Sequence, residues 1–302
     1  MQQPLIFDIK RYAINDGPGI RITIFFKGCP LSCIWCHNPE SISAKPQKMY
    51  NHDKCIGCGE CVKACPNQAC TLTADGIITD SNRCDLSGRC AKVCPTLATE
   101  ISGYYKSALE LLKIIEKERV LFDQSGGGVT FSGGEPLLYP DYLTEILDLC
   151  GKQQIHRTID TCGFVKEEIL LEMAKQTDLF LYDLKLMDSA KHKGYTGVSN
   201  ELILSNLVAL AKSGANIQIR IPLIKGVNSD LKNITETATF IAKLAGEKKS
   251  VNLLPYHDIA SHKYQKLGGN YQVDNLQEPD NVDLQQAIDC FTAHDLLTVV
   301  GG

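Results

Sequence analysis

Hydrophobic positions along most of the chain follow two spacings, one typical of strands and the other of helices. Short apolar or alternating runs predict strands at 21–27, 128–132, 155–161, 179–184, 217–224, 251–256 and 296–300. Between them, apolar residues recur at helical spacing and predict helices near 105–118, 140–151, 166–176, 200–213, 230–245 and 282–294. Strands that alternate with helices in this way form parallel βαβ units with right-handed crossovers. We therefore expect an α/β fold in which about six or seven units build a barrel, closed or partly open.

One stretch, from about residue 50 to 102, departs from this alternation. It is dense in cysteine, glycine and proline and has few periodic apolar positions. We predict that it is inserted into the barrel. The chain would then divide into a first part of the barrel (1–49), the insert (50–102) and the remainder of the barrel (103–302).

Composition excludes several classes of function. A hydrophobic share of 44% is too high for a mainly disordered chain, and a net charge of -4 lacks the basic surplus of nucleic-acid-binding proteins. No apolar run approaches the length of a membrane span. The first residues, 1–4, have neither the charged nor the apolar segment of a secretory signal. We expect a cytoplasmic protein that binds neither nucleic acid nor membranes.

The chain has fourteen cysteines, far above background. In a reducing cytosol, closely spaced cysteines are more often metal ligands or redox groups than disulfides. Ten of them form three groups between Cys29 and Cys94. The others stand alone, and we expect them to be small buried hydrophobic residues: Cys70, Cys150, Cys162 and Cys290.

The first group, Cys29, Cys33 and Cys36, follows the first predicted strand with C-x3-C-x2-C spacing. Three thiolates on one short loop can hold three corners of a cubane iron–sulfur cluster. The fourth iron would stay open to an outside molecule, as in a catalytic metal site with an open position. The alternative is a zinc site in which His37 is the fourth ligand.

The second and third groups form a repeat. Cys55, Cys58, Cys61 and Cys65 match the C-x2-C-x2-C-x3-C-P run of two-cluster bacterial ferredoxins, in which the fourth cysteine serves the other cluster. Cys84, Cys90 and Cys94 nearly repeat it, but Ser87 replaces one cysteine. One cluster would be complete, with Cys55, Cys58, Cys61 and Cys94. The other, with Cys65, Cys84 and Cys90, lacks a thiolate that Ser87 oxygen, Cys70, water or a three-iron cluster could replace.

Polar residues and glycines gather where the predicted strands end, which is where parallel barrels carry their chemistry. They are Gly133, Gly134, Glu135, Asp160, Thr161, Asp183, Lys185, Arg220 and His257.

Together these residues resemble the radical S-adenosylmethionine (SAM) superfamily, whose mark is the C-x3-C-x2-C loop. More narrowly, the chain is similar to the glycyl radical enzyme activating enzymes, the family of the pyruvate formate-lyase activase. That resemblance rests on DGPGIR at 16–21, GCP at 28–30, CHNP at 36–39, SGGGVTFSGGEP at 125–136 and LPYH at 254–257. It implies a partial (β/α)6 radical SAM barrel with an inserted bacterial ferredoxin-like domain.

The resemblance also implies an activity. SAM would bind the open iron of a 4Fe–4S cluster, and one electron would cleave it to methionine and a 5′-deoxyadenosyl radical. That radical would take a hydrogen atom from a glycine of a large partner, a glycyl radical enzyme. A ferredoxin or flavodoxin would supply electrons, and the insert, with one or two further clusters, would relay them or dock the partner.

Residue roles follow from the same resemblance. Cys29, Cys33, Cys36 and Lys185 are the catalytic candidates. The residues expected to bind SAM are Trp35, His37, Gly133, Gly134, Glu135, Asp183, Lys185, Arg220 and His257. For Trp35 the equal alternative is core packing, for His257 a loop cap, and for Arg220 an ion pair with Asp183.

Two further groups are implied. Asp160, Thr161 and Asp183 match positions that bind a monovalent cation near SAM, although Cys162 stands where the activase has asparagine. Asp16, Gly17, Pro18, Gly19 and Arg21 would accept the partner's glycine loop, or would simply form a tight turn. Two other functions remain open: a radical SAM enzyme acting on a small molecule, and a multi-cluster electron carrier.

Overall fold

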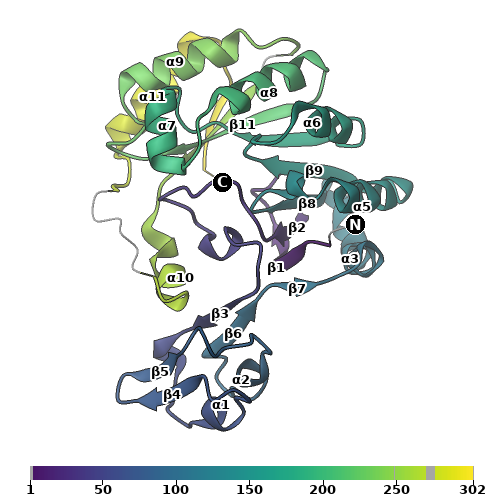
Figure 1. The fold of residues 1–302 in the computed structure, drawn as a ribbon. Helices are drawn as coiled ribbons and strands as arrows, with labels where there is room; N and C mark the ends of the chain where they lie inside the picture. The colour runs from purple at the N-terminus through teal and green to yellow at the C-terminus, as the bar shows by residue number, and fades with distance from the viewer. Residues whose placement is uncertain (1–2, 248, 270–275, 302) are drawn as a thin grey trace.

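The computed structural model describes residues 3–247, 249–269 and 276–301. The first and last residues of the predicted parts of the barrel, 1 and 302, lie outside the described residues. Within the described residues, a nine-stranded sheet has the order β13-β12-β11-β10-β9-β8-β2-β1-β7 (Figure 1). Its strands are β1 (Leu5–Ala13), β2 (Arg21–Phe26), β7 (Tyr104–Tyr105), β8 (Gly128–Gly133), β9 (His156–Thr161), β10 (Leu179–Asp183), β11 (Ile217–Leu223), β12 (Ser250–Pro255) and β13 (Thr298–Val300).

Seven of these strands form the predicted parallel sheet. In the series β2, β8, β9, β10, β11, β12 and β13, each strand pairs in parallel with the strand that follows it. All seven predicted strands are present, with bounds within two residues of those expected. β1 and β7, which were not predicted, add antiparallel at one edge. The outer strands of the sheet are β13 and β7, which fits a partial rather than a closed barrel.

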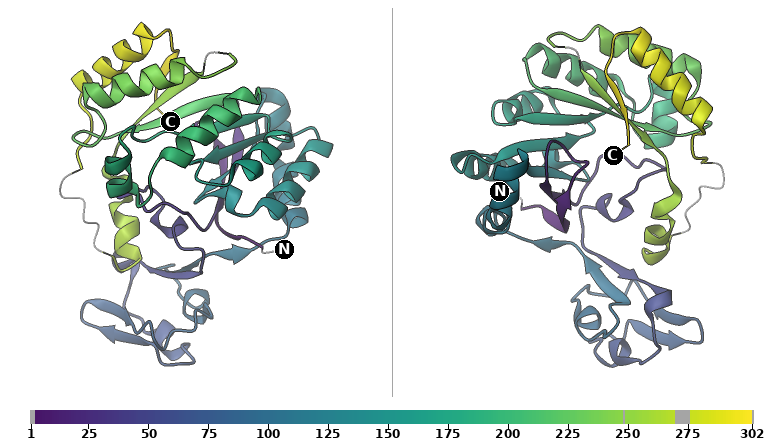
Figure 2. Two further views of the ribbon diagram at one scale, coloured as in Figure 1. Left: turned by 45° about the horizontal axis from the view of Figure 1, so that its top comes forward. Right: turned by 180° about the vertical axis from the view of Figure 1, so that it is seen from behind.

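The predicted helices are present and cover the outside of the curved sheet (Figure 2). They are α3 (Ala108–Ile115), α5 (Pro140–Lys152), α6 (Glu167–Ala174), α8 (Glu201–Lys212), α9 (Leu231–Ala242) and α11 (Asn281–Ala293). Outside the segment 50–102, three further helices of the described residues were not predicted: α4 (Arg119–Ser125), α7 (Ser189–Thr196) and α10 (Ser261–Lys266). None of the helices described is long and apolar enough to cross a membrane.

The core lies between these helices and the sheet. In β8, the five residues 128–132 are all buried, because the strand is covered on both faces. Apolar side chains of the helices pack onto the strands in one large cluster that includes Phe131, Leu147 and Leu207. Short 3₁₀ helices lie at Pro39–Ser41, His52–Lys54, Glu116–Glu118, Pro136–Leu138 and Asp258–Ala260.

The segment with the second and third cysteine groups lies apart from the barrel, below it in Figure 1. The chain enters it through β3 (Gln47–Tyr50) and leaves through β6 (Thr99–Ser102), which pair antiparallel. Between them lie α1 (Glu60–Lys63), the hairpin of β4 (Cys70–Thr73) and β5 (Gly76–Thr79), and α2 (Arg89–Lys92).

The two halves of this segment repeat in backbone conformation. Gly57 and Leu86, each two residues after the first cysteine of its group, have φ of 67° and 54°. Gly59 and Gly88 precede the two short helices with φ of 73° and 72°. The repeat in the cysteine spacing is therefore a repeat in structure as well.

Candidate active site at the cysteine loop

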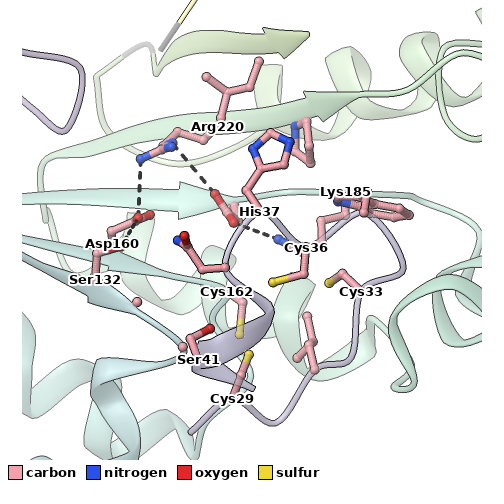
Figure 3. Close-up of a pocket in the computed structure, with 18 of the residues that line it drawn as sticks. Cys29, Cys33, Cys36, His37, Ser41, Ser132, Asp160, Cys162, Lys185 and Arg220 are labelled. Atoms are coloured by element: carbon pink, nitrogen blue, oxygen red, sulfur yellow. Dashed lines mark hydrogen bonds and ion pairs between the residues drawn. The ribbon is translucent and has the colours of Figure 1, made fainter. Parts of the chain in front are cut away.

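The first cysteine group faces a cavity at the carboxyl ends of the parallel strands (Figure 3). Its volume is about 980 Å³ including the open mouth, enough for a nucleoside-sized ligand. Most of the predicted residues line it: Cys29, Cys33, Trp35, Cys36, His37, Gly133, Gly134, Asp160, Thr161, Asp183, Lys185 and Arg220. The carboxyl ends of strands that are far apart in the sequence thus meet at this cavity.

The loop that carries the three cysteines is fixed by backbone hydrogen bonds. The amide of Gly28 donates to Ser41 O at 2.7 Å, and that of Ser32 to Thr196 O at 2.8 Å. The second bond ties the loop to the end of α7, a helix that the sequence pattern did not predict. Burial raises the pKa of Cys33 to about 11 and that of Cys36 to about 12.

The donor set fits an iron–sulfur cluster and not the zinc alternative. Within the described residues, no three His, Cys, Asp or Glu side chains are placed to hold a single metal ion. In a cubane each thiolate binds its own iron, so the sulfurs need only face one space. The His37 ring lies 6.1 Å from the ring of Tyr256 and hydrogen-bonds to the backbone of His257. His37 is thus engaged away from the cysteines.

The Gly-Gly-Glu loop after β8 is held against the cysteine loop. The amide of Gly134 donates to Phe26 O and that of Glu135 to Gly28 O, both at 2.8 Å. A Cβ on Gly133 would lie 2.3 Å from Phe26 N, and one on Gly134 would lie 2.0 Å from Gly28 O. Because these positions face backbone, the glycines are required for packing of the two loops, whatever ligand the cavity binds.

Glu135 lies beneath the cavity rather than in its lining. Its carboxylate is completely buried and accepts hydrogen bonds from Thr161 Oγ1 at 2.9 Å and from Cys162 N at 2.8 Å. Cys162 Sγ also donates to it, at 2.9 Å. Burial raises the pKa of Glu135, and the hydrogen bonds partly offset this effect. The side chain of Glu135 does not line the cavity.

Cys162 is a site residue that the sequence reasoning missed. It is buried, as expected, but it lines the cavity and its thiol hydrogen-bonds to Cys29, which it faces in Figure 3. Its position directly after Thr161, at the end of β9, was the signal that could have identified it. Ser132, also missed, lines the cavity and donates to Asp160 Oδ2 at 2.7 Å.

Charged groups from β9, β10 and β11 form the other wall. Lys185 Nζ donates to Asp183 Oδ2 at 2.7 Å. Burial lowers the pKa of Lys185, but Asp183 and the nearby thiols outweigh it and raise the pKa above its usual value. Burial raises the pKa of Asp160 to about 6, although Arg220 acts in the opposite direction.

Arg220 stands among three carboxylates. Its Nη1 is 3.4 Å from Asp160 Oδ2 and 3.9 Å from Asp16 Oδ1, and its Nε is 4.0 Å from Asp183 Oδ1. Nε and Nη1 are buried and have no hydrogen-bond partner in the part of the chain that the structure describes. The ion pair foreseen with Asp183 is present, beside those with Asp160 and Asp16.

Comparison with known proteins decides the family. Residues 23–238 match the radical SAM superfamily. The chain is 45% identical to the trans-4-hydroxy-L-proline dehydratase activating enzyme of Clostridioides difficile, over 99% of each chain. It is 40% identical to the choline trimethylamine-lyase activating enzyme of Oleidesulfovibrio alaskensis, over 97% of this chain and 96% of that one. The chain belongs to the glycyl radical enzyme activating enzymes of the radical SAM superfamily.

A solved structure agrees with this result. A domain of the pyruvate-formate lyase-activating enzyme from Bacteroides vulgatus shares 43% identity, with a TM-score of 0.51 over 59% of this chain and 100% of that one. The chain is therefore a radical SAM enzyme that uses SAM and a 4Fe–4S cluster to activate a glycyl radical enzyme. The two other functions considered from the sequence, a small-molecule radical SAM enzyme and an electron carrier, are not supported.

Besides Glu135, one residue predicted to bind SAM does not line the cavity. His257 does not line the cavity: its side chain is exposed and pairs with Glu278 at 3.5 Å. Tyr256, one residue earlier, lines the cavity and packs with Trp35 in a small apolar cluster. Trp35 was expected either to bind SAM or to pack in the core. It lines the cavity and also belongs to the apolar cluster.

The turn at 16–19 reaches into the barrel. Asp16 O accepts from Thr130 Oγ1 and its carboxylate from Thr23 Oγ1, both at 2.7 Å. Arg21 does not face outward as expected for a residue that contacts a partner. It is 1% exposed and donates to Pro18 O at 2.9 Å and to Val129 O at 2.7 Å. Arg21 therefore supports the turn from beneath.

A small cavity in the insert is lined by the four cysteines predicted for the complete cluster, Cys55, Cys58, Cys61 and Cys94. Cys61 also belongs to a buried group with Cys70 and Cys90, against which Cys55 and Cys65 pack.

Proposed function

We propose that Cys29, Cys33 and Cys36 hold the cluster of the radical SAM reaction and that the cavity beside them binds SAM. The observation that carries the proposal is that these three thiols and the charged groups of Asp183, Lys185 and Arg220 face one cavity. When bound, the cluster and SAM supply the reductive cleavage that gives a radical able to take a hydrogen atom from a partner glycine.

The polar wall would orient the amino acid end of SAM. Nε and Nη1 of Arg220 are ion-paired with carboxylates but not hydrogen-bonded within the described residues, so they suit a ligand carboxylate, and Asp183 suits an ammonium group. Lys185, held by Asp183, stays protonated and balances the negative charge of the cysteine loop. Gly133 and Gly134 contribute backbone to the wall, and Glu135 keeps it in place from beneath.

The aromatic wall would take the adenine. Trp35, His37 and Tyr256 line the cavity, and rings of this kind stack on bases. The backbone of His257 holds the His37 ring, which gives His257 a positioning role in place of direct contact.

A monovalent cation beside SAM is part of the proposal. Asp160 and Asp183 offer carboxylate oxygens, the ligands that hard cations prefer. The hydroxyl of Thr161 already donates to Glu135, and Arg220 already lies near both carboxylates. The cation would therefore share these carboxylates with the guanidinium.

The target glycine of the partner would approach the turn at 16–19. Tyr12 and Ile14, just before this turn, are 63% and 70% exposed, unusual for large hydrophobic side chains. Tyr12 and Ile14 would add to the surface that contacts the partner, and Arg21 would support the turn from beneath. In this proposal the only macromolecular substrate is the glycyl radical enzyme, and neither nucleic acid nor a membrane takes part.

The segment 50–102 is proposed to be a ferredoxin-like domain between two parts of the barrel, 1–49 and 103–302. The two cysteine groups and the repeated backbone conformations around them support further iron–sulfur clusters. Electrons would come from a ferredoxin or flavodoxin and pass through these clusters to the cluster of Cys29, Cys33 and Cys36.

The proposal is tested by installing the radical. Reduced, reconstituted protein is mixed with SAM and with a glycyl radical enzyme encoded next to its gene, and the mixture is frozen for electron paramagnetic resonance. We expect a glycyl radical signal that Cys33→Ala abolishes and Cys290→Ala leaves unchanged. SAM cleavage without a radical on any neighbouring glycyl radical enzyme would contradict the assignment of the partner site.

A further inference from the structure

The insert contains one cysteine that the ferredoxin pattern does not use. In that pattern Cys65, Cys84 and Cys90 hold three corners of the second cluster, and Ser87 stands where a cysteine belongs. Cys70 lies outside both motifs, at the start of β4. The inference below concerns this residue and rests on the insert clusters proposed above.

Cys70 faces the ligands of the second cluster. It is 4% exposed and belongs to a buried group with Cys61 and Cys90, against which Cys55 and Cys65 pack. The thiols of Cys65 and Cys70 are hydrogen-bonded to each other. The amide of Ala69, next to Cys70, donates to Cys65 Sγ at 3.2 Å.

Backbone hydrogen bonds bring Cys84 to the same place. The amide of Asp80 donates to Ala69 O at 2.8 Å, and that of Cys84 donates to Asp80 O at 3.1 Å. The short hairpin of β4 and β5 thus returns the chain to the start of β4. Cys84 and Cys90 in turn interact electrostatically. Cys84 is therefore near the group that contains Cys65, Cys70 and Cys90.

A positive charge is directed at Cys70. Lys48, on β3, donates from Nζ to Cys70 Sγ at 3.2 Å and to Thr79 Oγ1 at 2.7 Å. A neutral thiol is a weak acceptor, whereas an ammonium group forms a strong charge-assisted bond with a thiolate. This contact is what a metal-bound thiolate at Cys70 would need.

Ser87 is engaged elsewhere. It occupies the place of Cys58 in the repeat, but both its amide and its hydroxyl bind the carboxylate of Asp85. Cys70 also approaches Cys61, a residue of the first group, through their electrostatic interaction. However, the cavity of the first group is lined by its own four cysteines and not by Cys70. The first group therefore already has its full set of thiols.

We propose that Cys70 is the fourth thiolate ligand of the second cluster, which Cys65, Cys84 and Cys90 hold at its other corners. The insert then binds two complete 4Fe–4S clusters, and the chain holds about twelve iron atoms in all. Ser87→Cys should consequently not raise the iron content.

The test compares the full-length wild type with Cys70→Ala, Ser87→Ala and Cys150→Ala after anaerobic reconstitution. Cys150 is a matched control, because it is a completely buried cysteine of α5. Iron and sulfide are counted, and oxidised and reduced samples are examined by electron paramagnetic resonance. We expect Cys70→Ala to lose about one to four iron atoms and to show a three-iron signal or none from the second cluster. Ser87→Ala and Cys150→Ala should match the wild type.

A loss of packing is separated from a loss of ligand by Cys70→Ala combined with Ser87→Cys. If Cys70 is a ligand, the new thiol restores the iron content, whereas it would not repair a packing defect. Wild-type iron content and spectra in Cys70→Ala would overturn the assignment, as would a loss in Ser87→Ala. A wild-type chain that reconstitutes with only about four iron atoms would instead refute the proposed insert clusters themselves.

Discussion

Gly134 lies where the loop after β8 meets the cysteine loop. A methyl group there would lie 2.0 Å from Gly28 O, and neither backbone can shift without moving the cysteines. We expect Gly134→Ala to lower the free energy of unfolding by about 3 kcal/mol and to reduce the iron held at the first cluster. Thermal unfolding and iron analysis measure both effects.

The matched control is Gly194→Ala, on an exposed turn of α7 with open space around it. It should leave stability unchanged or raise it by up to about 1 kcal/mol, because alanine is the better helix former. Equal losses in the two variants would contradict the proposed packing of the loops.

His192 is a buried imidazole that gives stability a pH dependence. Its Nδ1 lies 2.7 Å from Val198 O, at the end of α7 that also holds the cysteine loop. Burial lowers the pKa of His192 below 6.5. As the pH falls through 6.5, the unfolded chain binds a proton that the folded chain does not, so stability falls.

We expect His192→Gln to weaken this dependence by at most about 1.4 kcal/mol per pH unit. Unfolding midpoints at pH 7.5 and 5.5, compared between wild type and variant, measure the difference. Parallel losses of stability in the two proteins over this range would show that His192 binds its proton equally in the folded and unfolded chains, which would contradict this prediction.

At the residue scale, the sequence identified which positions reach the site but not which way their side chains face. Strand ends placed Asp160, Asp183 and Arg220 correctly, because parallel strands end at one edge. Whether a side chain turns inward depends on the packing of its neighbours. This is why Tyr256 lines the cavity where His257 was expected, and why Arg21 is buried.

At the scale of elements, prediction succeeded where burial gives a strong pattern. β8 and β10 are buried along nearly their whole length because they are covered on both faces, and in β10 the buried residues form a continuous apolar run. β1 was missed because its middle residues are partly exposed and mix charges with apolar positions. α7 was missed because six of its eight residues are not buried, so its sequence, SAKHKGYT, carries almost no apolar periodicity.

The turn between β1 and β2 is the element that the partner is proposed to contact. Ile14 is 70% exposed, which is unusual for a large apolar side chain. We expect Ile14→Asp to raise the partner concentration needed for half-maximal activation by about tenfold, as for loss of a central apolar contact. Radical yield is measured by electron paramagnetic resonance against partner concentration.

The control for this variant is Val282→Asp, at an equally exposed residue of α11. It should leave the concentration dependence unchanged. An Ile14→Asp curve that coincides with that of the wild type would remove this turn from the partner interface.

At the scale of the whole molecule, the insert is joined to the barrel through β3 and β6 and lies to one side of it (Figure 1). If its clusters relay electrons, Cys58→Ala should slow activation several-fold when a flavodoxin or ferredoxin is the donor. Dithionite, a small reductant, reaches the first cluster directly, so it should restore the rate. The effect of Cys58→Ala is measured as the activation rate with each of the two donors. Equal slowing with both donors would favour a role of the insert in docking the partner.

The proposal that a cluster on Cys29, Cys33 and Cys36 cleaves SAM is tested most directly by product analysis. Reconstituted, reduced protein is incubated with SAM without oxygen, and 5′-deoxyadenosine is measured by chromatography. The wild type and Cys150→Ala should release it, and Cys33→Ala should release none. Release that survives Cys33→Ala, or no release from a wild type with its full iron content, would contradict the proposed site.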